Sequence, residues 1–265
     1  MTRIIQITDI HLTVPPHKVS GQLNTHALFE KAIDKIEQDL PLFGDIDAII
    51  ATGDITDHGD VESYELFKTQ ISRLNIPYLV IPGNHDSREA MLTSFPELSA
   101  SSTNGEINWV RSFSAFDVIG LDTVIPHQGA GALSPSTLQF LAQALAENPD
   151  KPALIAMHHP PFESGICFMD NIGLNGADEM ETLLKLTTRE VRVICGHLHN
   201  SIVCSMGNAT VLSSPAVASS FMTDHRPNAP VGFTQKPGGY MLHEWNNGFR
   251  SSYLSLSPNG DLYPF

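Results

Sequence analysis

Short apolar runs rich in β-branched residues recur along the chain, and each ends in a cluster of polar residues. Runs of this length that are bounded by glycine or proline are typical of buried strands. Five such strands are predicted, at residues 4–7, 48–51, 78–81, 153–157 and 191–195. Four longer segments between them are predicted to be helices, at residues 25–40, 61–74, 135–147 and 178–188. This alternation predicts an α/β fold in which helices cover a largely parallel or mixed sheet.

The remaining apolar runs are predicted to form the hairpins of a second sheet, at residues 107–121, 201–204, 210–212, 240–245 and 249–256. Between them, Ser219–Gly239 is rich in proline, glycine and polar residues, which is typical of a long functional loop. The chain has 265 residues without an internal repeat or a low-complexity linker. One domain over residues 1–265 is therefore expected, with 219–239 as its specificity loop.

Polar motifs follow the predicted strands, and six of the 12 histidines lie in them. In chain order the motifs are Asp9-Ile10-His11, Gly53-Asp54, Gly83-Asn84-His85-Asp86, His158-His159-Pro160-Pro161 and Gly196-His197-Leu198-His199. Each motif alone is also typical of a turn or a helix cap. Because ligands bind at the carboxyl edge of open α/β sheets, we expect one sheet edge to bring all five together. Alternate residues of an extended segment point the same way, so Asp9 and His11 are expected to face one cavity, as are the two histidines of the last motif.

The donor types in these motifs indicate a transition metal. Carboxylate and imidazole groups together select borderline ions such as Mn, Fe, Co and Zn, whereas Mg and Ca favour shells of oxygen alone. The net charge agrees with this, because 29 acidic and only 15 basic residues give −14. So acidic a chain is not expected to offer an extended basic groove for nucleic acid. An anionic substrate would therefore need the positive charge of bound metal ions.

The five motifs, in this order, resemble the signature of the calcineurin-like metallophosphoesterases, and the resemblance covers Asp9 to His199. It implies a four-layered αββα sandwich with two mixed β-sheets flanked by helices. It also implies two divalent metal ions, Mn or Fe in the first place and Zn or Co as alternatives. The ligands implied for the first ion are Asp9, His11, Asp54 and His199, and those for the second are Asp54, Asn84, His158 and His197. Asp54 would thus bridge the ions, whereas His159 is not expected to be a ligand.

The same resemblance implies a hydrolytic mechanism. Two dications lower the pKa of a bridging water from about 16 toward 7, so that a metal-bound hydroxide can attack a phosphate ester at neutral pH. His85 is not expected to be a ligand but to reach the phosphate, where it would stabilise the transition state or protonate the leaving alkoxide. Asp86 is expected to orient His85 through a hydrogen bond, with the capping of a helix that begins at Ser87 as an equal alternative.

Within the family, the opening Gln6–His11, the final Gly-His-Leu-His and the stretch Leu174–Asp178 resemble the bacterial class III cyclic-nucleotide phosphodiesterases and their glycerophosphodiesterase relatives. The resemblance implies a small phosphodiester substrate, with 3′,5′-cyclic AMP first and a glycerophosphodiester second. A phosphomonoesterase or nucleotide pyrophosphatase of the same fold stays open, as does a non-catalytic binding scaffold. The residues considered for specificity are His17, Asn24, His58, Phe162–Phe168, Phe221, His225 and Arg226.

Cysteine usage and hydropathy bear on the location of the protein. Cys167, Cys195 and Cys204 form neither a paired framework nor a Cys-x-x-Cys motif, which favours a reducing compartment. No stretch reaches the roughly 20 apolar residues of a membrane span, and the first residues enter a strand without a signal-like apolar region. A cytoplasmic enzyme without membrane or long nucleic-acid partners is therefore expected. A homodimer is implied by the resemblance alone.

Overall fold

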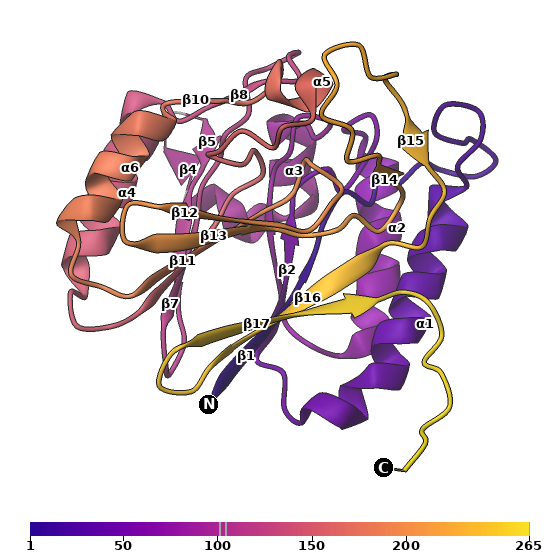
Figure 1. Cartoon of the computed structure of the whole chain (residues 1–265), viewed down its shortest axis with the longest axis horizontal. Coiled ribbons are helices and arrows are strands. Elements are labelled where there is room, and N and C mark those ends of the chain that lie inside the picture. The colour runs from indigo at the N-terminus through magenta and orange to yellow at the C-terminus, as the bar shows by residue number, and fades with distance from the viewer. Residues whose placement is uncertain (101, 104, 265) are drawn as a thin grey trace.

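Two β-sheets lie against each other in the computed structural model, which describes residues 1–100, 102–103 and 105–264 (Figure 1). The first sheet has the strand order β17-β16-β1-β2-β3, and the second has the order β12-β13-β11-β9-β7-β6. Both sheets are mixed. The strands of the first are β1 (Thr2–Ile7), β2 (Ala48–Thr52), β3 (Tyr78–Ile81), β16 (Gly239–Trp245) and β17 (Phe249–Ser255). Those of the second are β6 (Trp109–Ser112), β7 (Asp117–Gly120), β9 (Ala153–Ala156), β11 (Val191–Cys195), β12 (Ile202–Met206) and β13 (Ala209–Ser213).

Helices cover the outer face of each sheet (Figure 1). Phe29 and Ile33 of α1 and Phe67 of α2 join the core of the first sheet, because residues three to four apart share one helix face. Leu141 of α4 and Leu184 of α6 pack into a second core on the other sheet. This layering confirms the αββα sandwich. The helical segments are α1 (Thr25–Phe43), α2 (Val61–Ile71), η1 (Ser72–Leu74), α3 (Arg88–Ser94), η2 (Pro96–Ala100), α4 (Pro135–Glu147), α5 (Cys167–Asp170) and α6 (Ala177–Leu186).

Short two-stranded ribbons complete the described structure. They pair β4 (Ser102–Thr103) with β5 (Glu106–Ile107), β8 (Gly131–Ala132) with β10 (Leu174–Asn175), and β14 (Ser220–Phe221) with β15 (Phe233–Thr234). The last ribbon lies inside the segment 219–239, so the predicted specificity loop is partly a small hairpin. Among the described residues, no helix combines the length and the apolar character that a membrane crossing requires.

The predicted hairpins form, but they do not all belong to the second sheet. β6–β7 and β12–β13 do, whereas β16–β17 joins the first sheet, where β16 pairs with β1 through Leu242 and Ile5. Without β16, the N-terminal strand would have an unpaired edge beside its partner β2. A hydrophobic pattern shows that a strand is buried, but it does not show which sheet the strand joins.

The strands that precede the five motifs are likewise divided between the sheets. β1, β2 and β3 run parallel in the first sheet, and β9 and β11 run parallel in the second. The expectation of a single sheet edge is therefore wrong. The Gln6 side chain spans the junction, since its Nε2 donates to Thr52 Oγ1 (2.8 Å) in one sheet and to the Cys195 carbonyl (3.1 Å) in the other. The carboxyl ends of strands from both sheets thus meet at one end of the sandwich.

Candidate metal centre

The loops that follow these strands have an uncommon backbone conformation. Positive φ angles between 48° and 68° occur at Asp9, His11, Asp54, His197 and His199. Non-glycine residues rarely adopt this left-handed region, which costs about 1–3 kcal/mol at each position. Asp9 and His11 therefore do not lie in an extended segment, and neither do His197 and His199, so that prediction is wrong. Asp9 and His11 nevertheless enter the same cluster. Strain of this kind persists where the surrounding structure holds it in place.

Contacts between the loops hold this backbone. His11 N donates to the Asp54 carbonyl (2.9 Å), and His197 N donates to Asp9 Oδ2 (3.0 Å), which links the two sheets. Gly83 lets the loop after β3 approach closely, because a Cβ there would lie 2.2 Å from Asp54 Oδ1. The motif residues are therefore fixed by their neighbours before any ligand is considered.

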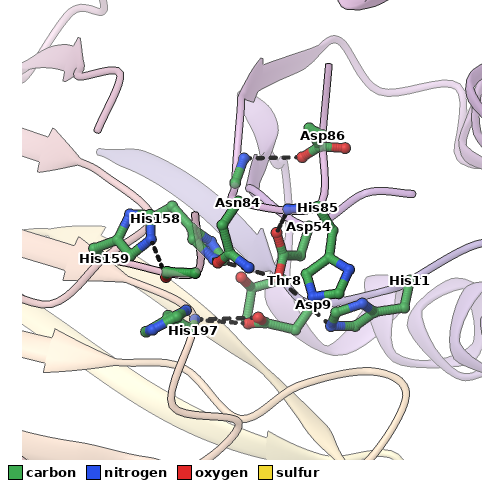
Figure 2. A network of polar contacts seen from close by, with 12 residues as sticks. Thr8, Asp9, His11, Asp54, Asn84, His85, Asp86, His158, His159 and His197 are labelled. Carbon is green, nitrogen blue, oxygen red and sulfur yellow. Dashed lines mark hydrogen bonds and ion pairs between the residues drawn. The ribbon is translucent and has the colours of Figure 1, made fainter. Parts of the chain in front are cut away.

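The seven side chains expected to bind metal converge at this end of the sandwich, and Figure 2 shows six of them by name. Two groups, Asp9 with His11 and His199, and Asp9 with Asp54 and His158, each have the geometry to hold a metal ion. The closest contacts between donor atoms are His158 Nε2 to Asn84 Oδ1 (3.1 Å), His11 Nε2 to His199 Nε2 (3.3 Å), His199 Nε2 to Asp9 Oδ1 (3.3 Å) and His158 Nε2 to Asp54 Oδ2 (3.4 Å).

Each of the four candidate histidine ligands is tethered through one ring nitrogen. His158 Nδ1 donates to the Thr52 carbonyl (2.8 Å), and His197 Nε2 donates to the Ile172 carbonyl (3.1 Å). A carbonyl only accepts, so these contacts set the tautomer and leave the other nitrogen with a lone pair. The remaining tethers join His11 Nδ1 to Asp57 Oδ1 (3.2 Å) and His199 Nδ1 to Ser219 Oγ (3.0 Å). Such tethering is typical of metal-binding histidines.

The electrostatics of the cluster also suit cations. Asp9 and Asp54 are both buried. Burial acts to raise the pKa of Asp54, but His158 and His11 hold it well below its ordinary value. Burial acts to lower the pKa of His158, but Asp54 raises it to about 9. Asp54 thus favours the protonated form of His158, whereas burial lowers the pKa of His197 to about 3. A divalent ion that replaces the proton on His158 fits the same donors.

His159 lies beside the cluster but has different contacts. Its Nδ1 lies 2.8 Å from Thr123 Oγ1, and its Nε2 lies 3.1 Å from the Gly129 carbonyl, so both ring nitrogens are engaged. Burial, followed by the neighbouring His197 and His158, lowers its pKa well below the ordinary value. His159 also forms, with His158 and His197, a group that could hold a metal ion, so its exclusion from the ligands stays a prediction.

His85 stands at the rim of the cluster, where 41% of its side chain is exposed. Its Nδ1 donates to the Asp57 carbonyl (3.0 Å), which leaves Nε2 for a substrate, and its ring meets His11 edge-on at 4.6 Å. Asp57 lies outside the five motifs, yet its Oδ1 is 3.2 Å from His11 Nδ1. Its position three residues after Asp54 was the only signal that it shares this loop.

The prediction that Asp86 orients His85 through a hydrogen bond is wrong. Its carboxylate accepts hydrogen bonds from Thr56 N (3.1 Å) and Tyr64 OH (2.9 Å), whereas the partner of His85 is Asp57. The cap of α3 is Ser87, so the alternative role of Asp86 as a helix cap is also wrong. Buried beside Asp54, whose charge adds to the effect of burial in raising its pKa, Asp86 ties the loop after β2 to the loop after β3.

A cavity of about 240 Å³ opens beside the cluster. Two of the residues considered for specificity, Phe168 and Phe221, line it. Arg226 does not, because its side chain is 70% exposed and pairs with Asp224. Ser219 and Phe233 of the predicted specificity loop also line it. The lining residues that no pattern predicted are Val19, Ser20, Leu23, Asp57, Met169, Ile172 and Ala218.

Comparisons with known sequences agree with this geometry. The profile described as calcineurin-like phosphoesterase matches residues 2–201. A protein of Arcobacter nitrofigilis named "Probable glycerophosphodiester phosphodiesterase GpdQ" is 31% identical over 265 residues, which cover 99% of this chain and 96% of the relative. The 3′,5′-cyclic adenosine monophosphate phosphodiesterase CpdA of Escherichia coli K12 is 29% identical over 223 residues, covering 83% of this chain and 77% of the relative.

Solved structures show the same fold at lower sequence identity. A dimetal phosphatase from Danio rerio superposes with a TM-score of 0.71 at 13% identity, over 97% of this chain and 96% of that chain. At this identity the likeness concerns the fold alone.

Proposed function

The chain belongs to the calcineurin-like phosphoesterase family, and from this premise we propose that it is a dinuclear-metal phosphodiesterase acting on small phosphodiesters. The convergence of carboxylate, amide and imidazole donors from both sheets carries the proposal. Asp54 Oδ2 lies 3.6 Å from His11 Nε2 and 3.4 Å from His158 Nε2, so it stands between the two sets of ligands. A carboxylate in this place suits a bridge between two dications.

The ligand assignment follows the two sets. The first set is Asp9, His11, Asp54 and His199, and the second is Asp54, Asn84, His158 and His197. Mn or Fe suits these nitrogen and oxygen donors best, with Zn or Co as alternatives. When bound, two such ions neutralise the charge of a phosphate and provide a nucleophile from water near neutral pH.

His85 supplies the proton chemistry of the reaction. Its Nδ1 is held by the Asp57 carbonyl, so the ring presents Nε2 from the rim toward the cavity. In the protonated ring, Nε2–H donates first to a phosphate oxygen and then its proton to the leaving alkoxide. Asp86 acts at a distance, because it fixes the loops that carry Asp54 and His85 without touching the substrate.

The substrate is a small phosphodiester with 3′,5′-cyclic AMP as the first candidate. A relative named for that activity, together with the apolar side of the cavity, supports this candidate. A glycerophosphodiester is the second candidate, supported by the relative that is 31% identical over 99% of this chain.

The test is a comparison of diester and monoester turnover with manganese added. Hydrolysis of bis-(p-nitrophenyl) phosphate should exceed that of p-nitrophenyl phosphate, and product-resolved assays should then rank cyclic AMP against glycerophosphodiesters. A strong preference for the monoester would show a phosphomonoesterase instead. A protein prepared with transition metal that binds less than one ion and hydrolyses nothing would be a non-catalytic scaffold.

A further inference from the structure

One side of the cavity is apolar, although the cluster beside it is polar and charged. We call this side the apolar wall, formed by Val19, Leu23, Phe168, Ile172, Phe221 and Phe233. These residues come from three separate segments of the chain: the loop before α1, the segment around α5, and the β14–β15 hairpin. Figure 1 shows β14, β15 and α5 at the same end of the sandwich. Three loops therefore bring apolar side chains to the place where the substrate must enter.

The wall is held in place by its own packing. Phe221 stacks on the His199 ring at 4.2 Å with an interplanar angle of 19°, and Phe168 meets Phe221 edge-on at 5.2 Å. Beneath them lies a small core of Ile166, Met169 and Leu198. Aromatic pairs at these distances are stabilising beyond the area that they bury. Phe168, Ile172 and Phe221 are thus supported from behind by this core and by the His199 ring.

The wall retains exposed apolar surface that faces the cavity. Phe168, Phe221 and Phe233 are only partly buried, although each lines the cavity. Apolar surface gathered in a concave site with a few polar groups is typical of ligand binding. In the part of the chain that the structure describes, no Lys or Arg lines this cavity. This lining suits a group with an apolar face, and it offers no Lys or Arg to a second phosphate.

We propose that the apolar wall binds the planar ring of one ester group of the substrate, so that Phe221 and Phe233 select phosphodiesters that carry a nucleobase or an aryl ring. This rests on the proposed function and adds the residues that decide between its substrates. A quaternary ammonium group would also suit aromatic side chains. Phe221 stacks on the candidate ligand His199, however, so a cation here would lie next to the proposed dications. A neutral ring avoids this repulsion.

The decisive variant is Phe233→Ala, because Phe233 lines the wall without stacking on a candidate ligand. Stacking on an aromatic side chain changes binding by about 10-fold to 100-fold per base. With manganese, Phe233→Ala should therefore lose about 10-fold to 100-fold in kcat/KM on cyclic AMP, mainly through KM. Hydrolysis of glycerophosphoethanolamine, which has no ring, should change less than about 3-fold. Metal content, measured on each protein, should stay at the wild-type value.

Met222→Ala is the matched control, because Met222 follows Phe221 but is 56% exposed and does not line the cavity. It should leave both substrates unchanged. An equal loss on both substrates in Phe233→Ala would overturn the role of the wall while leaving the phosphodiesterase intact. A larger loss on glycerophosphocholine than on cyclic AMP would show a cation cage instead of a ring site. Wild-type protein that hydrolyses no diester at all would overturn the proposed function itself.

Discussion

Two clusters of buried carboxylate lie at opposite ends of the strands, and they balance their charge in different ways. At the amino end of β7, Asp117 is 2% exposed and is paired with Arg189 Nη2 (2.9 Å) and Lys151 Nζ (2.7 Å). At the carboxyl ends, Asp9 and Asp54 are just as buried, but their charged neighbours are histidines. The charge of Asp117 is therefore balanced by the side chains of Arg189 and Lys151. The cluster of Asp9 and Asp54 has metal-binding donors and negative charge, but among the described residues no Lys or Arg pairs with it.

The difference shows how a structural carboxylate can be told from a metal-binding one. Asp117 lies in a regular strand, whereas Asp54 has a φ of 48°. Burying an unpaired charge is costly, so a buried carboxylate keeps either a protein cation or a bound ion. The surrounding loops hold the strained backbone at Asp54, and this conformation directs its side chain into the cluster.

The largest effect is expected from Asp54→Ala. Removing the carboxylate between the two ligand sets should abolish turnover and eliminate the second metal ion together. Metal analysis of the purified variant and a diester assay measure both. Asp117→Asn is the matched control, because it alters a buried carboxylate far from the cavity and should keep metal content and turnover. A variant Asp54→Ala that retains both ions would refute the bridging role.

The next largest effect is expected from His85→Ala. Loss of the proton donor should lower kcat by about 10²-fold to 10⁴-fold while both metal ions remain bound. His26→Ala serves as the control, since His26 lies in α1, pairs with Glu30 and does not line the cavity. Loss of metal from the His85 variant would mean that His85 is a ligand, contrary to the assignment.

Only part of the site can be predicted from the sequence. Strand ends such as Ile7 before Asp9 are visible because an apolar run stops at a polar motif. The assignment of strands to sheets is not visible, since β16 and β13 are both buried runs and differ only in their partners. The left-handed backbone at Asp54 is hidden as well, because tertiary contacts impose it against the preference of the residue.

The roles of single residues divide in the same way. Asp57 belongs to no motif, and Phe233 lies in the predicted specificity loop without being singled out there; both reach the cavity because the fold brings their loops together. Asp86 sits within a motif, yet its contacts with Thr56 and Tyr64 depend on the packing of α2 against the loop after β3. A pattern along the chain therefore finds the donors and some of the side chains that line the cavity, but it does not find the side chains that position the donors.

Metal ions should stabilise the folded protein through the cluster of Asp9 and Asp54, and not through that of Asp117. A ligand that binds only the folded state, at a free concentration about 100 times its dissociation constant, stabilises that state by about 2.7 kcal/mol. For a protein of this size, this raises the Tm by about 5–10 °C. Adding manganese to chelator-treated protein should produce this shift in wild type and in Asp117→Asn. Asp54→Ala should show a smaller shift or none. Equal shifts in all three proteins would place the stabilising ions elsewhere.

The smallest effect is expected on the free energy of unfolding when low pH protonates the Asp117 carboxylate. Burial acts to raise the pKa of this carboxyl, but hydrogen bonds from Lys151, Ser112 and Arg189 lower it from 3.8 to about 2. A depressed pKa means that the charged form stabilises the folded state above pH about 4, and that this contribution, about 2 kcal/mol, is lost as the pH falls toward 2. Urea unfolding of metal-free wild type and Asp117→Asn between pH 5 and pH 2 should show the gap between their stabilities narrowing by that amount. If the difference in free energy of unfolding stays constant over this range, the Lys151 and Arg189 contacts do not depend on the charge of Asp117. Protein cations would then not be what balances this buried carboxylate, and the contrast with Asp9 and Asp54 would be lost.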